Sequence, residues 1–149
     1  MSYLFLMITI IGLDQWSKYK AQDFLRQRGS FYSITKRFQL RLAHNPGGFY
    51  GLLENKKRLL YIITFFAIVG CAFLLYQGIK NQRMLSYNLA FSFLLGGAIG
   101  NFIDRIKQGY VIDFIYIKFK RAPIFNLADV SIFVGALMLS YLEIVYGIF

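Results

Sequence analysis

The segment Met84–Arg105 reads MLSYNLAFSFLLGGAIGNFIDR, an apolar run that ends abruptly at the charged pair Asp104-Arg105. A bilayer has a hydrocarbon core of roughly 30 Å, which about 20 helical residues cross. Residues 84–103 are therefore long enough to span it. The small residues of GGAIG are typical of close helix packing in membranes, and they lack the spacing and the preceding strand of a nucleotide-binding loop. This segment predicts a membrane-spanning helix with polar groups at one end.

Three other apolar segments extend the same pattern along the 149-residue chain, which is 57% hydrophobic. We expect a single membrane domain, residues 1–149, with spans at about 1–27, 59–77, 84–103 and 129–149 and a cap at about 28–58. The first segment lacks a basic n-region and a cleavage site, so we expect a retained span rather than a signal peptide. The predicted fold class is an integral membrane protein, mainly α, with four transmembrane helices.

Two connecting segments have the character of strands. Phe38–Leu42 alternates apolar and polar residues, the period of a strand with one buried face. Val111–Phe119 is rich in β-branched and aromatic residues. The turn signal Asn45-Pro46-Gly47-Gly48 follows the first of these segments. The connections therefore predict a small β-containing cap and a second, short loop.

Composition restricts the chemistry. The chain has one histidine, His44, and one cysteine, Cys71, so these residue types cannot assemble a zinc site. We interpret Cys71 as a packing residue within a span and His44 as a loop residue. Carboxylates are then the main catalytic candidates, and we expect no metal and no cofactor.

The net charge of +10 would favour nucleic acid as the partner of a soluble protein. Here the Lys and Arg residues flank apolar spans, where each gains roughly 1 kcal/mol from anionic lipid head groups. Membrane lipid is the predicted partner, and no nucleic acid is expected.

Four aspartates lie where apolar segments meet loops: Asp14, Asp104, Asp113 and Asp129. Alternating crossings place all four at the same face of the membrane. Such groups are costly near lipid, by roughly 2.5–3.5 kcal/mol at the bilayer centre, and usually face a protected interior or water.

The four aspartates differ in their neighbours. Asp14 with Lys18, four residues apart, and Asp104 with Arg105 favour structural ion pairs. Asp113 and Asp129 have no adjacent cation in the sequence, which favours acid–base catalysis. Asp129 alone is also compatible with a helix N-cap.

Two other kinds of protein fit some of these features. A proton-coupled transporter also uses membrane carboxylates, but it would distribute them near the midplane and would show internal repeats. A lipid-binding scaffold would tolerate Asp113→Asn and Asp129→Asn. The carboxylates crowd one end and no repeat is visible, which argues against a transporter and favours acid–base catalysis.

Together these motifs resemble the lipoprotein signal peptidase family, also called signal peptidase II, over essentially the whole chain. The matching blocks are Asp14-Gln15-Trp16-Ser17-Lys18, Asn45 with Gly47, Gly96-Gly97-Ala98-Ile99-Gly100-Asn101-Phe102-Ile103-Asp104-Arg105, Val111-Ile112-Asp113-Phe114 and Phe125-Asn126-Leu127-Ala128-Asp129. The glycine-rich block and the Asn-x-Ala-Asp block are together highly specific.

The resemblance implies a bacterial aspartic endopeptidase, a monomer, that removes the signal peptide from diacylglyceryl-modified prolipoproteins by cutting before the lipidated cysteine. It places the catalytic pair at Asp113 and Asp129, which activate a water. The supporting or substrate-binding positions that it implies are Asp14, Lys18, Asn45, Gly47, Asn101, Asp104, Arg105, Asn126 and Ala128.

The resemblance also implies a multi-pass protein of the bacterial plasma (inner) membrane, with an extracytoplasmic cap and an active site near the outer face. The charge pattern alone predicts the reverse, because all but Lys80 and Arg83 of the 17 Lys and Arg residues lie on the aspartate face. We follow the resemblance, since a folded cap on an anionic lipid surface explains basic residues outside.

Overall fold

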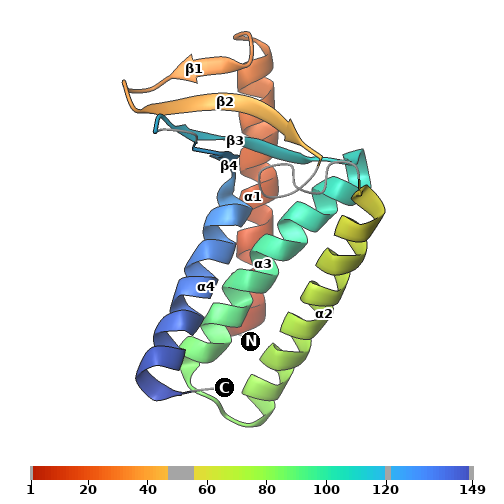
Figure 1. Ribbon diagram of the computed structural model, residues 1–149, viewed down its shortest axis with the longest axis vertical. Coiled ribbons are helices and arrows are strands. Elements are labelled where there is room, and N and C mark those ends of the chain that lie inside the picture. Colours follow the sequence, from red (N-terminus) through yellow and green to blue (C-terminus); the bar gives the residue numbers. More distant parts are fainter. Residues whose placement is uncertain (1, 47–55, 120–121, 148–149) are drawn as a thin grey trace.

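The structure is a computed structural model that describes residues 2–46, 56–119 and 122–147. Four helices and a small sheet make up these residues (Figure 1). In chain order the elements are α1 (Ser2–Arg26), β1 (Phe31–Ser33), β2 (Phe38–Asn45), α2 (Lys57–Lys80), α3 (Leu85–Gln108), β3 (Val111–Ile117), β4 (Ile124–Phe125) and α4 (Leu127–Tyr146).

Helix α3 is the centre of the bundle. It packs against α1, α2 and α4, and Figure 1 shows it between α2 and α4 with α1 behind. The helix runs from Leu85 to Gln108, and the left-handed backbone of the capping residue Gly109 (φ 80°) closes its last turn. The first residues of α1 and the last of α4 lie at the end of the bundle opposite the sheet.

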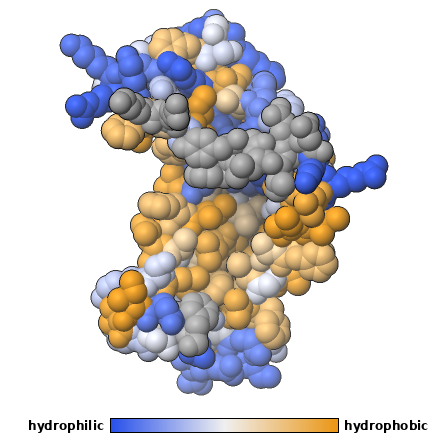
Figure 2. All heavy atoms as spheres, viewed as in Figure 1, coloured by the Kyte–Doolittle hydropathy of each residue, from blue (hydrophilic) through white to orange (hydrophobic). Residues whose placement is uncertain are grey.

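Among the described residues, three helices are long and apolar enough to cross a membrane: α2, α3 and α4. The fourth span expected from the sequence, α1, is not among them, because its second half contains Asp14, Gln15 and Lys18. Figure 2 shows hydrophobic atoms over the middle of the helices and hydrophilic atoms at the sheet end and the opposite end. This distribution suits a multi-pass membrane protein.

Helices α3 and α4 approach closely because each presents a glycine to the other. A Cβ at Gly97 would meet the carbonyl oxygen of Ala128, and Ile132 Cγ1 at 2.7 Å. A Cβ at Gly135 would meet the carbonyl oxygen of Ala90 at 2.7 Å. The packing role predicted for the glycine-rich segment is confirmed.

The sheet is antiparallel, in the order β1-β2-β3-β4, and lies at one end of the bundle (Figure 1). The strands predicted within 38–42 and 111–119 are both present, as parts of β2 and β3. The sheet packs on α1 through a cluster of Ala21, Leu25 and Phe114, to which Leu40 and Leu42 add. This cluster fixes β3, and with it Asp113, beside the helices.

The glycine contacts give a testable expectation for stability. Gly97→Ala places a methyl group against the backbone of α4, which must move, so we expect a loss of about 1–3 kcal/mol. Gly70→Ala in α2 is the matched control, because a Cβ there meets nothing within 4 Å. Thermal unfolding in detergent should show a lower Tm for Gly97→Ala only; equal Tm values for the two variants would contradict this packing.

Candidate active site

The N-terminus of α4 positions Asp129. Asn126 is the N-cap: its side-chain oxygen accepts the backbone N–H of Asp129 at 2.9 Å, and Asp129 Oδ2 accepts the backbone N–H of Asn126 at 3.2 Å. This reciprocal capping box holds Asp129 in the first helical turn, where the helix dipole favours an anion. The possibility that Asp129 is itself the N-cap is therefore wrong, because Asn126 fills that position.

Strand β3 positions Asp113, which is buried and 3% exposed. It lies opposite Ala43 of β2, and β2 ends at Asn45. Asp113 Oδ2 accepts a hydrogen bond from Asn45 Nδ2 at 3.0 Å, and Oδ1 accepts one from Asn126 Nδ2 at 2.7 Å. Both carboxylate oxygens therefore have amide donors.

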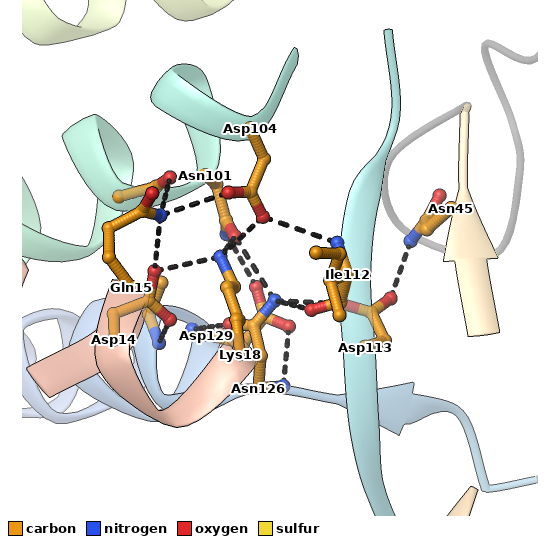
Figure 3. A network of polar contacts seen from close by, with 12 residues as sticks. Asp14, Gln15, Lys18, Asn45, Asn101, Asp104, Ile112, Asp113, Asn126 and Asp129 are labelled. Carbon is orange, nitrogen blue, oxygen red and sulfur yellow. Dashed lines mark hydrogen bonds and ion pairs between the residues drawn. The ribbon is translucent and has the colours of Figure 1, made fainter. Parts of the chain in front are cut away.

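Asn126 and Asn101 connect the two carboxylates (Figure 3). Asn126 donates from its side chain to Asp113 and from its backbone to Asp129. Asn101 Nδ2 donates to Asp129 Oδ1 at 2.8 Å, and its oxygen accepts from Asn126 Nδ2 at 3.1 Å. One continuous set of hydrogen bonds thus joins Asp113 on β3 to Asp129 on α4.

Behind the two asparagines lies a buried trio of charged groups. Lys18 Nζ is 2.7 Å from Asp14 Oδ2, 2.9 Å from Asp104 Oδ2 and 3.0 Å from Asn101 Oδ1. The predicted pairing of Asp14 with Lys18 is confirmed. The predicted pairing of Asp104 with Arg105 is wrong, because Asp104 turns inward to Lys18.

The sequence did not single out Gln15, although it lies within one of the matching blocks. Gln15 Nε2 donates to Asp104 Oδ1 at 2.9 Å and to the carbonyl oxygen of Gly100 at 3.2 Å. Backbone groups also contribute: the N–H of Ala128 donates to Asp14 and that of Ile112 to Asp104. The position of Gln15 next to Asp14 was the only signal available in the sequence.

Burial, first, and the negative charge of Asp129, second, raise the pKa of Asp113 to about 7. Hydrogen bonds from Asn45 and Asn126 and the charge of Lys18 oppose this rise. Two interacting carboxylates share protons as a unit. The pair is therefore suited to hold one proton near neutral pH.

Both carboxylates open onto one cavity of about 500 Å³. One side of it is polar, with Asn45, Asn101 and Arg105 beside the pair. The other side is apolar and comes from α2 and α4. Its residues include Leu60, Ile132, Phe133 and Ala136. A cavity of this size and mixed lining suits an elongated ligand with polar and apolar parts.

Arg105 projects from the end of α3 into this cavity and is 9% exposed. Its Nε is buried and has no hydrogen-bond partner among the described residues. Its charge interacts with both Asp129 and Asp113. A buried donor without a partner is costly, so this group is suited to an acceptor from a bound ligand.

Of the residues predicted for the site, the structure brings together Asp14, Lys18, Asn45, Asn101, Asp104, Arg105, Asp113, Asn126, Ala128 and Asp129. Gly47 lies outside the described residues. The roles assigned to these residues stay predictions.

An apolar helical bundle in which a buried and a half-buried carboxylate share a cavity defines a membrane protein suited to acid–base chemistry. The family model described as "Signal peptidase (SPase) II" matches residues 6–145. The chain belongs to the signal peptidase II family and is a protease.

Relatives and solved structures agree with this assignment. The lipoprotein signal peptidase of Caldanaerobacter subterraneus subsp. tengcongensis is 44% identical over 138 residues, which cover 93% of this chain and 92% of the relative. That of Enterococcus faecalis is 39% identical, over 91% of this chain and 83% of the relative. A bacterial membrane enzyme solved by the in meso method at 1.9 Å is 27% identical, with a TM-score of 0.81 over 97% of this chain and 94% of that chain.

Proposed function

We propose that this protein is an aspartic endopeptidase that removes the signal peptide from diacylglyceryl-modified prolipoproteins, cutting before the lipidated cysteine. The observation that supports this best is the shared cavity. Asp113 and Asp129 meet at its polar side, while α2 and α4 supply an apolar side suited to acyl chains. Membership of the signal peptidase II family supplies the substrate class.

The proposal includes the arrangement in the membrane. Residues 1–149 form a single domain with four spans, acting as a monomer in the bacterial plasma membrane, with the sheet and the active site near the outer face. Helix α1 serves as the fourth span because its charged residues Asp14 and Lys18 are turned inward, at 0% and 1% exposure. Its lipid-facing side presents apolar groups such as Phe5, Ile8 and Leu13.

In the proposed mechanism Asp129 is the ionised base and Asp113 holds the proton. The Asp129 carboxylate takes a proton from a water as that water's oxygen bonds to the scissile carbonyl carbon. Asp113 gives its proton to the carbonyl oxygen, which forms a neutral tetrahedral intermediate. Asp129 then protonates the departing amine as the C–N bond breaks, and Asp113 recovers a proton from the intermediate's hydroxyl. The pair returns to its starting state.

Removal of either carboxylate should abolish this cycle. For Asp113→Asn and Asp129→Asn we expect turnover to fall by about 10²–10⁴-fold or more, because each loses a proton-transfer group. The assay is cleavage of a diacylglyceryl-modified prolipoprotein by purified enzyme in detergent, with and without a chelator. The control is Asp23→Asn, the same chemical change at an exposed position of α1.

Full activity of both dyad variants would place the catalytic groups elsewhere, with Asp14 and Asp104 next to test. Loss of wild-type cleavage in the chelator would overturn the metal-free mechanism. Each variant should keep the wild-type unfolding temperature within a few degrees for the comparison to hold.

The dyad also predicts a pH dependence. The pKa of Asp113 is raised to about 7. Above that pH Asp113 is ionised and cannot protonate the carbonyl oxygen, so kcat/KM should fall about tenfold per pH unit as the pH rises beyond it. A profile measured at constant ionic strength tests this. A kcat/KM that stays constant from pH 6 to 9 would contradict the assignment of the proton to Asp113.

Arg105 is proposed to bind a carbonyl oxygen of the substrate in the cavity. Arg105→Gln should then raise KM roughly tenfold or more, since a hydrogen bond to a charged group contributes about 1.5–3 kcal/mol. Lys107→Gln, on the exposed side of the same helical turn, is the matched control. Steady-state kinetics of the two variants decide the point, and an unchanged KM in Arg105→Gln would remove it from the binding site.

A further inference from the structure

The ammonium group of Lys18 has a partner for each of its three hydrogens. Asp14, Asp104 and Asn101 accept them, at 2.7, 2.9 and 3.0 Å, and the side chain is 2% exposed. An ammonium group can donate hydrogen bonds but cannot accept them. Whatever faces Lys18 must therefore be an acceptor.

This restricts Asn101, whose amide has an acceptor end and a donor end. Its oxygen faces Lys18 and also accepts from Asn126, so its NH₂ group must face Asp129, which it does at 2.8 Å. The reversed amide would set two donors against each other at Lys18 and two acceptors against each other at Asp129. Lys18 makes that arrangement unfavourable.

The second asparagine is fixed in the same manner by a different group. The backbone N–H of Asp129 can only donate, and the oxygen of Asn126 accepts it. The NH₂ group of Asn126 therefore points to Asp113. Each amide is thus oriented from behind by a group that only donates, and each directs its own donor at one carboxylate.

We propose that Lys18 is a positioning residue that fixes the orientation of Asn101 and thereby keeps an amide donor directed at the carboxylate of Asp129. With Asn101 held in this orientation, Asp129 receives a donor that stabilises its ionised form. The effect of this positioning on catalysis rests on the proposed function, whereas the orientation of Asn101 by Lys18 does not.

Other charged and titratable groups surround the pair and could affect its protonation. Among the described residues, Arg105 on α3 interacts with both carboxylates, Tyr61 on α2 and Asp104 on α3 lie beside Arg105, and Asp14 on α1 lies beside Lys18. Loss of the Lys18 charge alone would raise the proton affinity of the pair by Coulomb's law. A test must therefore separate charge from hydrogen-bond direction.

The double variant Asp14→Asn/Lys18→Gln makes this separation. It removes one carboxylate and one ammonium together, so the net charge of the trio is unchanged, while glutamine can offer an oxygen as well as an NH₂ group. Lys18→Arg keeps a cation that only donates. Lys20→Gln, an exposed cation on the same helix, is the control for loss of a surface charge.

The first readout is an infrared titration of protonated carboxyl groups in the purified enzyme without substrate. The Asp113→Asn variant identifies the Asp113 band. In Asp14→Asn/Lys18→Gln we expect protonated Asp129 to persist to a pH about one unit higher than in the wild type, the size expected for loss of one charged hydrogen bond. The acid limb of kcat/KM should move by the same amount. Lys18→Arg and Lys20→Gln should leave the infrared titration and the pH of the acid limb unchanged.

A second variant covers the case in which the double variant does not fold. Asn101→Leu leaves Lys18 between Asp14 and Asp104 but removes the donor to Asp129, so it should produce the same shift. The triple variant Asp14→Asn/Lys18→Gln/Asn101→Leu should titrate like Asn101→Leu alone, because Lys18 acts through Asn101.

The inference would be overturned if the folded Asp14→Asn/Lys18→Gln and Asn101→Leu variants titrated like the wild type, or if Lys20→Gln showed an equal shift. An infrared shift in an enzyme that does not cut the lipidated prolipoprotein would uphold the inference and refute the proposed function. Cleavage by the wild type without any infrared shift in the variants would refute the inference alone.

Discussion

The burial of one ammonium group between two carboxylates is the constraint on which the rest of the structure depends. An unpaired charge in a low-dielectric interior costs several kcal/mol, so Lys18 can be buried only if α1 and α3 pack in the register that brings Asp14 and Asp104 to it. Asp14 Oδ1 accepts the backbone N–H of Ala128, and Asp104 Oδ2, which also contacts Lys18, accepts the backbone N–H of Ile112. The trio therefore also fixes where α4 begins and where β3 passes, which are the two segments that present the candidate catalytic carboxylates.

Such a register requires space that only small residues provide. A Cβ at Gly100 would lie 2.7 Å from Asp14 Oδ2, and Ala128 is fully buried where α4 meets the trio. The glycine-rich segment of α3 thus permits close helix approach and also leaves room for charged side chains between the helices. Packing and electrostatics act at the same place, since the contacts that bring the helices together also exclude water from the ion pairs, which strengthens them.

The parts of this arrangement that depend on local sequence could be predicted. Apolar length predicted α2, α3 and α4, alternation predicted β2, and the position of aspartates at segment ends indicated a common site. The partner of Asp104 could not be predicted, because its neighbour Arg105 is the obvious cation and Lys18 is 86 positions away. The same holds for Asn126: a capping role is local, but its second role, between Asp113 and Asn101, depends on a strand and a helix that meet only in the folded chain. Helix α1 combines the buried Asp14 and Lys18 with exposed apolar groups such as Phe5 and Ile8, so it is not among the helices that are apolar enough to cross a membrane.

The cavity relates the buried charges to the proposed chemistry. Helix α2 has only Leu60 and Gly78 buried; it meets α3 closely at Gly78, where a Cβ would lie 2.8 Å from Tyr87 Cε1, and α4 meets α3 closely at Gly135. The apolar side of the cavity comes from both helices, and its polar side from the asparagines and the carboxylate pair. In the proposed reaction, a substrate with acyl chains along α2 and α4 would bring its peptide to the pair. Its arrival would displace water from Asp113, whose raised pKa already reflects burial. Because desolvation favours the neutral form of a carboxyl group, substrate binding would then strengthen the hold of Asp113 on the proton that the proposed mechanism assigns to it.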